Sequence, residues 1–281
     1  LFSQRLIHIE STEANLARTP MAALHVRGRI KTIFEQILDK CGREPRLVAV
    51  GKSDGQGDQD PGKRYFSLDD EEEYDSDATP IKPQRLMRDL PTIFPPNTHY
   101  LADSGNSFSW AIHYLHPYDR RMSGQRDGRG GLFQVAMEFA SMGWAIGGAI
   151  GVALACRPDP VVCLVGDGSM LMAGQEITVA IQEKLPVIFV VLNDSAYGMV
   201  KHGQKKTGAE PIGYRLPQVD FAAFAESMGV PGYLINSPQD LRSLNGRQLC
   251  GREGPSLLDV RIDPEETPPI GLRTQVLSRD Y

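Results

Sequence analysis

Two short polar clusters, each placed directly after an apolar run, carry the residue types that could do chemistry. Gly166-Asp167-Gly168-Ser169 follows one run, and Asn193-Asp194 follows the next run along the chain. Glycines on both sides of Asp167 allow a tight turn and a close approach of the backbone to a phosphate. Ser169 and the amides after it would open a helix, where an anion is favoured. The first cluster therefore predicts a phosphate-binding turn.

The carboxylate of Asp167 adds a cation to this interpretation, because it would repel a phosphate unless a positive ion lay between them. Hard oxygen ligands favour Mg²⁺, which takes six of them. Here they would be side-chain oxygens, a backbone carbonyl, diphosphate oxygens and water. A plain turn is the simplest alternative. A dinucleotide fingerprint is less favoured, because Leu171 stands where its third glycine would be.

The elements that must position these clusters alternate between strands and helices. Apolar runs predict strands over 99–102, 161–165, 187–192 and 256–262, and helical spacing predicts helices over 83–90, 107–115, 133–155, 173–184 and 221–228. Nearly all-apolar strands alternating with helices favour an α/β fold with a doubly wound parallel sheet and helices on both faces. In such a fold the two clusters emerge at the same edge and can share one ligand.

Three regions divide the chain. Residues 1–42 hold a strand at 5–10 and a helix at 30–38, which is half a domain at most. Residues 43–83 lack apolar periodicity and include the acidic run Asp69–Asp75, so they predict a solvated, flexible linker, with an acidic binding patch as the alternative. Residues 84–281 form the main domain. Because the chain begins at Leu1 rather than at a methionine, we expect a piece of a longer protein.

The net charge and the spacing of the cysteines favour a protein that acts on small molecules in a reducing compartment. A formal net charge of −5 gives no broad attraction for nucleic acid or an anionic membrane, so we expect neither as a partner. The four cysteines form no CxxC pair, which fits the cytoplasm. The longest apolar run, 142–156, is shorter than the roughly 20 residues of a membrane span and is predicted to be a buried helix.

With these features the sequence resembles the thiamine diphosphate-dependent enzymes, specifically the acetolactate synthase and 2-oxo acid decarboxylase group. Their signature is Gly-Asp-Gly followed, after one helix and one strand, by Asn-Asn or a variant. Counted from Asp167, the family's interval falls on Asp194. The resemblance implies Mg²⁺ ligation by Asp167, Asp194 and the backbone carbonyl of Ala196. A one-residue slip would use Asn193 and Ser195 instead.

Three further segments carry the resemblance. Ala102–Ala111 is similar to the family's diphosphate-binding segment, and Ala140–Ala145 to the segment whose methionine props the cofactor in its bent form. Tyr197–Gln204 is similar to the segment after the metal ligands. Without the family, Met142 would be a core methionine. The resemblance implies cofactor contacts at Gly105, Asn106, Ser107, Ala140, Met142, Gly166, Gly168, Ser169, Tyr197, Gly198 and Met199.

The chain departs from the biosynthetic synthases at Gly203, where they place a tryptophan that shapes the acceptor pocket, so the substrate stays open. His202 either faces the substrate or is solvated, as most loop histidines are. The resemblance implies thiamine diphosphate- and Mg²⁺-dependent decarboxylation or carboligation of a 2-oxo acid such as pyruvate, by a homodimer or homotetramer. No side chain here is predicted to be catalytic.

The resemblance also assigns 1–42 to the end of the family's central domain. The pyrimidine-binding domain, with the glutamate that activates the cofactor, would come from the same or a neighbouring subunit. We therefore expect this chain alone to be inactive. The alternatives are a simple 2-oxo acid decarboxylase, a noncatalytic thiamine diphosphate-binding module, and an enzyme half that recruits a separately encoded subunit.

Overall fold

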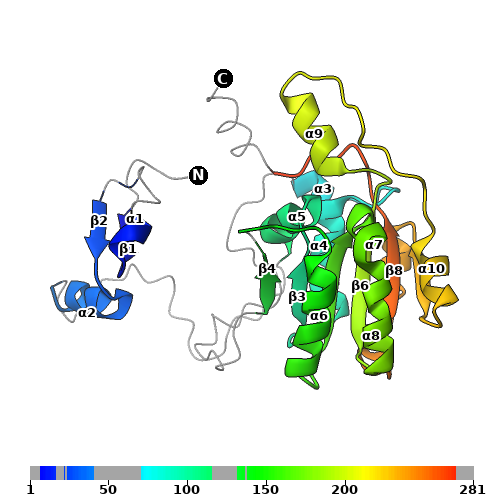
Figure 1. Cartoon of the computed structure of the whole chain (residues 1–281), viewed down its shortest axis with the longest axis horizontal. Coiled ribbons are helices and arrows are strands. Elements are labelled where there is room, and N and C mark those ends of the chain that lie inside the picture. The colour runs from blue at the N-terminus through cyan, green and yellow to red at the C-terminus, as the bar shows by residue number, and fades with distance from the viewer. Residues whose placement is uncertain are drawn as a thin grey trace. The chain divides into compact units, whose positions relative to one another are not determined.

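The computed structural model describes residues 7–16, 22, 24–40, 71–115, 132–136 and 138–269. The chain divides into two compact units, Leu1–Ser67 and Leu68–Tyr281. In the smaller unit, β1 and β2 pair in parallel and are accompanied by two helices (Figure 1). Its described elements are β1 (Ile7–Glu10), α1 (Glu13–Leu16), β2 (Leu24–Arg27) and α2 (Ile30–Lys40).

The larger unit contains, within the described ranges, a parallel six-stranded sheet of order β4-β3-β5-β6-β8-β7. Its strands are β3 (His99–Ala102), β4 (Phe133–Val135), β5 (Val161–Gly166), β6 (Val187–Asn193), β7 (Gly232–Ile235) and β8 (Ser256–Arg261). The helices are α3 (Glu71–Asp75), α4 (Pro83–Ile93), α5 (Asn106–Tyr114), α6 (Trp144–Ala155), α7 (Asp167–Ala173), α8 (Ile177–Gln182), α9 (Gly198–Lys206), α10 (Phe221–Ser227), α11 (Pro238–Arg242) and α12 (Gly246–Cys250).

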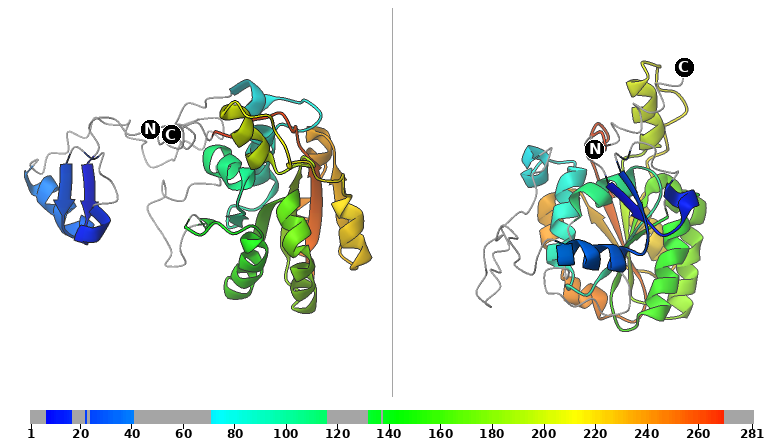
Figure 2. Two further views of the ribbon diagram at one scale, coloured as in Figure 1. Left: turned by 45° about the horizontal axis from the view of Figure 1, so that its top comes forward. Right: turned by 90° about the vertical axis from the view of Figure 1, so that its left-hand side faces the viewer.

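The strands are apolar on both sides because helices cover both faces of the sheet (Figure 2). Val162 and Leu164 of β5 pack in the core with α4, α5, α11 and α12. Val161, Cys163 and Val165 point the other way and pack with α6, α7, α8 and α10. The predicted doubly wound α/β fold is confirmed. No helix in the described ranges is long and apolar enough to span a membrane.

The strand order places a topological switch point between β3 and β5. From β3 the chain crosses to the outer neighbour β4, and then returns through α6 to β5 on the other side of β3. The connections leaving β3 and β5 therefore diverge and leave a crevice beyond the carboxyl ends of these strands, where ligands of open α/β sheets bind. The Gly166–Ser169 cluster lies directly at that edge.

Two predicted helices are wrong in their extent. The predicted helix over 133–155 contains instead the edge strand β4 and, after a break, α6 beginning at Trp144. Gly143 precedes α6 in the left-handed conformation with φ 86°, which ends any continuous helix there. The predicted helix over 173–184 is shorter, because a 3₁₀ turn at Gly174–Glu176 separates α7 from α8.

The prediction of a solvated linker up to residue 83 is wrong for residues 71–83. Part of the acidic run forms α3, whose Tyr74 is buried against the ring of Tyr114, with ring centroids 6.2 Å apart. Ile81 is fully buried and bridges to Ile262 after β8. One apolar residue in five is enough to anchor an acidic helix whose other side chains reach water. The rest of the predicted linker, 43–70, lies outside the described residues.

This packing predicts that Tyr74→Ala destabilises the larger unit by about 3 kcal/mol, because it leaves a cavity beside Tyr114. Glu72→Ala, at an exposed position of the same helix, is the control and should change the free energy of unfolding by no more than about 0.5 kcal/mol. Urea denaturation measures both. Equal stabilities for the two variants would mean that α3 does not belong to the core.

Candidate functional site

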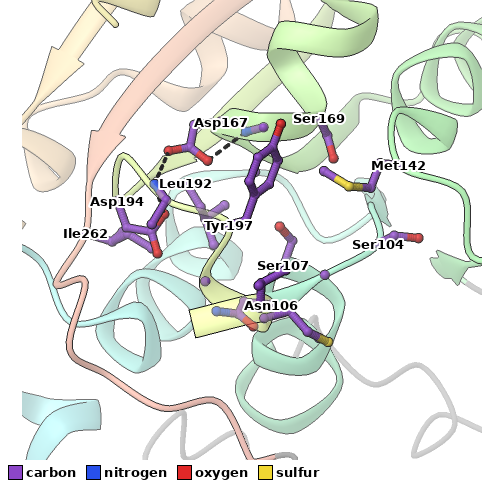
Figure 3. A pocket seen from close by; sticks show the side chains of 17 residues that line it. Ser104, Asn106, Ser107, Met142, Asp167, Ser169, Leu192, Asp194, Tyr197 and Ile262 are labelled. Carbon is purple, nitrogen blue, oxygen red and sulfur yellow. Dashed lines mark hydrogen bonds between the residues drawn. The ribbon is translucent and has the colours of Figure 1, made fainter. Parts of the chain in front are cut away.

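A pocket open to solvent lies at the carboxyl ends of β3, β5 and β6 (Figure 3). The loops after these three strands build most of it, and Met142 before α6 and Ile262 after β8 complete the lining, so residues far apart in the sequence meet there. All the predicted cofactor and metal residues except Ala140 line it. The lining residues are Ser104, Gly105, Asn106, Ser107, Met142, Gly166, Asp167, Gly168, Ser169, Leu192, Asp194, Ala196, Tyr197, Gly198, Met199, Val200 and Ile262.

Backbone N–H groups hold the two acidic loops together at one end of the pocket. Asp167 Oδ1 accepts a hydrogen bond from Gly168 N at 2.7 Å, and its Oδ2 accepts one from Ala196 N at 3.2 Å (Figure 3). The same Ala196 N–H lies 3.2 Å from Asp194 Oδ1. One amide of the β6 loop therefore contacts both carboxylates, and the loops cannot separate without breaking the bond from Ala196 N to Asp167.

The alternative register through Asn193 and Ser195 has little support from the geometry. Asn193 is the last residue of β6, and its amide nitrogen donates to Asp259 Oδ1 at 2.8 Å and to Val219 O at 3.1 Å. These bonds hold the side chain in the sheet, away from the pocket. Neither Asn193 nor Ser195 is among the lining residues, whereas Asp194 is.

Burial makes both acidic side chains costly to ionise. It raises the pKa of Asp167 to about 6, against the opposing effect of its backbone hydrogen bonds. Burial and then the charge of Asp167 raise the pKa of Asp194 to about 7. Near neutral pH the pair by itself therefore retains protons that a cation would displace, because an opposite charge nearby favours the ionised form.

The donor set fits a hard cation that also binds a ligand. Among the described residues no group of three or more His, Cys, Asp or Glu side chains is arranged to hold a metal ion. Two carboxylates alone satisfy only part of the six-fold shell of Mg²⁺. The remaining positions would fall to backbone carbonyls, ligand oxygens and water, which is the set expected from the sequence.

Polar groups without protein partners face the rest of the pocket. Ser169 Oγ and Asn106 Oδ1 are buried and have no hydrogen-bond partner among the described residues. Buried polar atoms are normally satisfied, so both indicate a ligand or water. α5 and α9, nine residues each, begin at the pocket with Asn106 and Gly198, and their N-termini favour an anion.

Glycines keep this end of the pocket open. A Cβ added at Gly168 would lie 2.5 Å from Tyr197 Cε1, and one added at Gly198 would collide with the amide of Asn106. Gly105 has φ 97°, which other residues rarely adopt. Glycine is therefore required at these positions by the space or backbone geometry of the site.

Met142 lines the pocket and is 39% exposed, so it is not the core methionine that its apolar context alone favoured. Ala140 is exposed, does not line the pocket, and has φ 50°. Such strain in a non-glycine residue is common near functional sites. His202 lies on α9, is buried to 2% exposure and is not among the pocket residues, so it is neither solvated nor aimed into this pocket.

Asp103 is a buried residue of the site that sequence reasoning missed. Its Oδ2 accepts from Gly143 N at 2.8 Å and its Oδ1 from Ala145 N at 2.9 Å, so it caps α6 and fixes the chain next to Met142. The available signal was an aspartate directly after a buried strand. Asp103 itself does not line the pocket, whereas Ser104 and three apolar residues that the sequence did not single out do: Leu192, Val200 and Ile262. The apolar three carried no signal because apolar residues there look like core.

Comparisons with known proteins agree with this geometry. Residues 103–260 match the family model described as thiamine pyrophosphate enzyme, C-terminal TPP binding domain. A Mycobacterium tuberculosis protein named "Putative acetolactate synthase large subunit IlvB2" is 35% identical over 201 residues, 68% of this chain and 33% of that protein. The Escherichia coli acetolactate synthase isozyme 3 large subunit is 28% identical over 93% of this chain and 44% of its own length.

A third relative, named "Probable pyruvate decarboxylase Pdc101" in Schizosaccharomyces pombe, is 29% identical over 64% of this chain and 30% of its own length. The chain thus spans less than half the length of each of these three relatives. The residues matched by the family model lie within the larger unit and include every residue of the two acidic loops.

The capping role of Asp103 predicts that Asp103→Asn lowers the free energy of unfolding by about 1–3 kcal/mol, because the amide nitrogen would face a buried N–H. Asp220→Asn is a matched control, since Asp220 caps α10 at an exposed position where asparagine caps equally well. Chemical denaturation compares the two. A loss in Asp220→Asn as large as in Asp103→Asn would contradict the assigned role.

Proposed function

Because this chain belongs to the thiamine pyrophosphate enzymes and is acetolactate synthase-like, we propose that its pocket binds thiamine diphosphate through Mg²⁺. In this proposal Asp167, Asp194 and the carbonyl of Ala196 hold the ion. The observation that carries it is the contact of one amide, Ala196 N–H, with both carboxylates. That contact brings two carboxylates together at a pocket where a bound cation would favour the ionised form of both.

The other pocket residues would hold the diphosphate and thiazolium parts of the cofactor. Ser169 Oγ is a free donor for a phosphate oxygen, and the N-termini of α5 and α9 add partial positive charge. Met142 would support the rings from the α6 side. When bound, the cofactor supplies the carbanion chemistry that 2-oxo acid decarboxylation needs, and the protein supplies binding and orientation.

The names of the relatives support a proposal for the reaction class. Two of the three are named acetolactate synthases and one a pyruvate decarboxylase, so we propose decarboxylation of a 2-oxo acid such as pyruvate, followed by carboligation or protonation. As further proposals, the pyrimidine-binding domain of the same or a neighbouring subunit completes the cofactor site in a cytoplasmic homodimer or homotetramer. This chain alone would then bind the cofactor but not turn over pyruvate.

The metal assignment predicts that Asp167→Asn and Asp194→Asn each weaken Mg²⁺-dependent binding of thiamine diphosphate by about 100-fold or more, since loss of the outer partners of metal ligands already costs 10–100-fold. Calorimetric titration with and without Mg²⁺ measures this. Asp159→Asn, before β5 at the opposite end of the same strand, is the control and should bind normally. Unchanged affinity in the Asp167 variant would refute the assignment.

The shape of the pocket predicts that Gly168→Ala weakens thiamine diphosphate binding by about 10-fold or more, because the new methyl group displaces Tyr197 into the space for the ligand. Gly147→Ala is the control, since an added Cβ there meets no atom within 4 Å. Cofactor titration followed by tryptophan fluorescence compares the variants. Equal affinities would show that the cofactor does not occupy this end of the pocket.

A further inference from the structure

Lys201 is a cation buried beside the pocket that the proposed function leaves without a role. It lies in the first turn of α9, is only 4% exposed, and its Nζ donates to Pro264 O at 2.8 Å and to Glu265 Oε1 at 2.5 Å. The same Nζ lies 5.9 Å from the centre of the Tyr214 ring, within the range of a cation–π contact. It therefore joins the segment after β8 to the segment around Tyr214.

The segment around Tyr214 in turn holds the loop of Asp194. Tyr197 N donates to Tyr214 O at 2.7 Å, and Leu216 N donates to Ser195 O at 2.9 Å. Between these bonds Ala196 and Arg215 form an antiparallel bridge. Ala196 and Arg215 therefore form a non-hydrogen-bonded pair of an antiparallel ladder. In such a pair the two residues make no backbone hydrogen bonds to each other, so the N–H and C=O of Ala196 point away from the Tyr214 segment.

This orientation is the one a metal site there needs. The N–H of Ala196 points to Asp167 Oδ2, at 3.2 Å. In extended backbone the C=O of a residue points to the same side as its N–H, so the carbonyl of Ala196 also lies on the side that faces away from the Tyr214 segment. The Tyr214 segment thus sets the direction of the third proposed ligand without contacting the metal position.

We propose that Lys201 is a positioning residue: by fixing Tyr214 and the segment of Pro264 and Glu265 together, it holds the Asp194–Tyr197 loop in the geometry that binds the cation. The affinity of the site for Mg²⁺ then depends on the segment after β8. This inference rests on the proposed function, because it concerns the same metal site.

Electrostatics alone predicts the opposite sign, which makes the proposal easy to test. The positive charge of Lys201 acts on Asp194 and repels a divalent ion bound there. Binding is therefore measured at a pH at least one unit above the pKa of Asp194, about 7, where that carboxyl ionises without help from Lys201. There, if charge were its only influence, removing Lys201 would tighten Mg²⁺ binding. If Lys201 orients the loop, removing it weakens binding despite the relief of repulsion.

The test uses the full chain with thiamine diphosphate at fixed concentration and Mn²⁺ in place of Mg²⁺, whose free fraction is read from its electron paramagnetic resonance signal. Lys201→Met should weaken Mn²⁺ binding by about 10-fold, the lower end of losses for groups that orient metal ligands. Lys205→Met is the matched control: Lys205 binds the same carboxylate, Glu265 Oε2 at 2.9 Å, from an exposed position, and its loss should leave the affinity within about two-fold.

A second pair of variants avoids any change to the buried charge. Tyr214→Leu removes the aromatic ring and should also weaken Mn²⁺ binding. Tyr214→Phe keeps the ring, so its affinity for Mn²⁺ should equal that of the unaltered chain. Tyr214 is only half-buried, so both variants should fold. Three results would each overturn this inference while leaving the proposed function standing. They are Mn²⁺ binding by Lys201→Met that is as tight as in the unaltered chain or tighter, a weakening in Lys205→Met as large as in Lys201→Met, and normal Mn²⁺ binding by Tyr214→Leu. Absence of Mn²⁺ binding by the unaltered chain would overturn the proposed function.

Discussion

The rest of the site depends on one constraint, the closeness of two carboxylates that repel each other. Asp167 and Asp194 end neighbouring parallel strands, and the Ala196 N–H contacts both. Backbone N–H groups donate to both carboxylates but do not offset the cost of burying them, because burial still raises the pKa of both groups. The arrangement persists because β5 and β6 are packed on both faces. The packing of the sheet stabilises the fold enough to offset the unfavourable closeness of the two carboxylates.

That geometry requires the strands to be immobile. The residues of β6 are buried throughout, and their side chains alternate between two separate apolar cores. Moving the end of β6 relative to β5 would disturb both cores at once. Asn193 adds a further lock, because its amide joins the end of β6 to Asp259 of β8. The position of Asp194 is therefore fixed by its neighbours in the sequence and by the next strand of the sheet.

The sequence was sufficient for the four central strands β3, β5, β6 and β8 and for most of the residues that line the pocket, because nearly all-apolar strands leave few options and parallel strands end at one edge. The edge strands were missed, since β4 was predicted to be part of a helix and β7 was not predicted. The sequence was also insufficient where one residue decides a boundary. Gly143 and the cap from Asp103 end the predicted long helix, and that cap joins residues 40 positions apart. Tyr74 anchors an acidic run that charge density alone assigned to solvent. Such outcomes depend on tertiary partners, which local patterns do not contain.

The pocket is unevenly built, and this bears on how it would bind a ligand. Its acidic end is closed by backbone hydrogen bonds and by glycines without room for a side chain. At the Met142 end, Ala140 is exposed and Phe139 is 94% exposed within the described residues. Apolar contacts from these residues would therefore contribute less than charge does. On the proposed function, binding would depend chiefly on the cation and on the helix N-termini, and the Met142 end would need additional surfaces to exclude water from the cofactor rings.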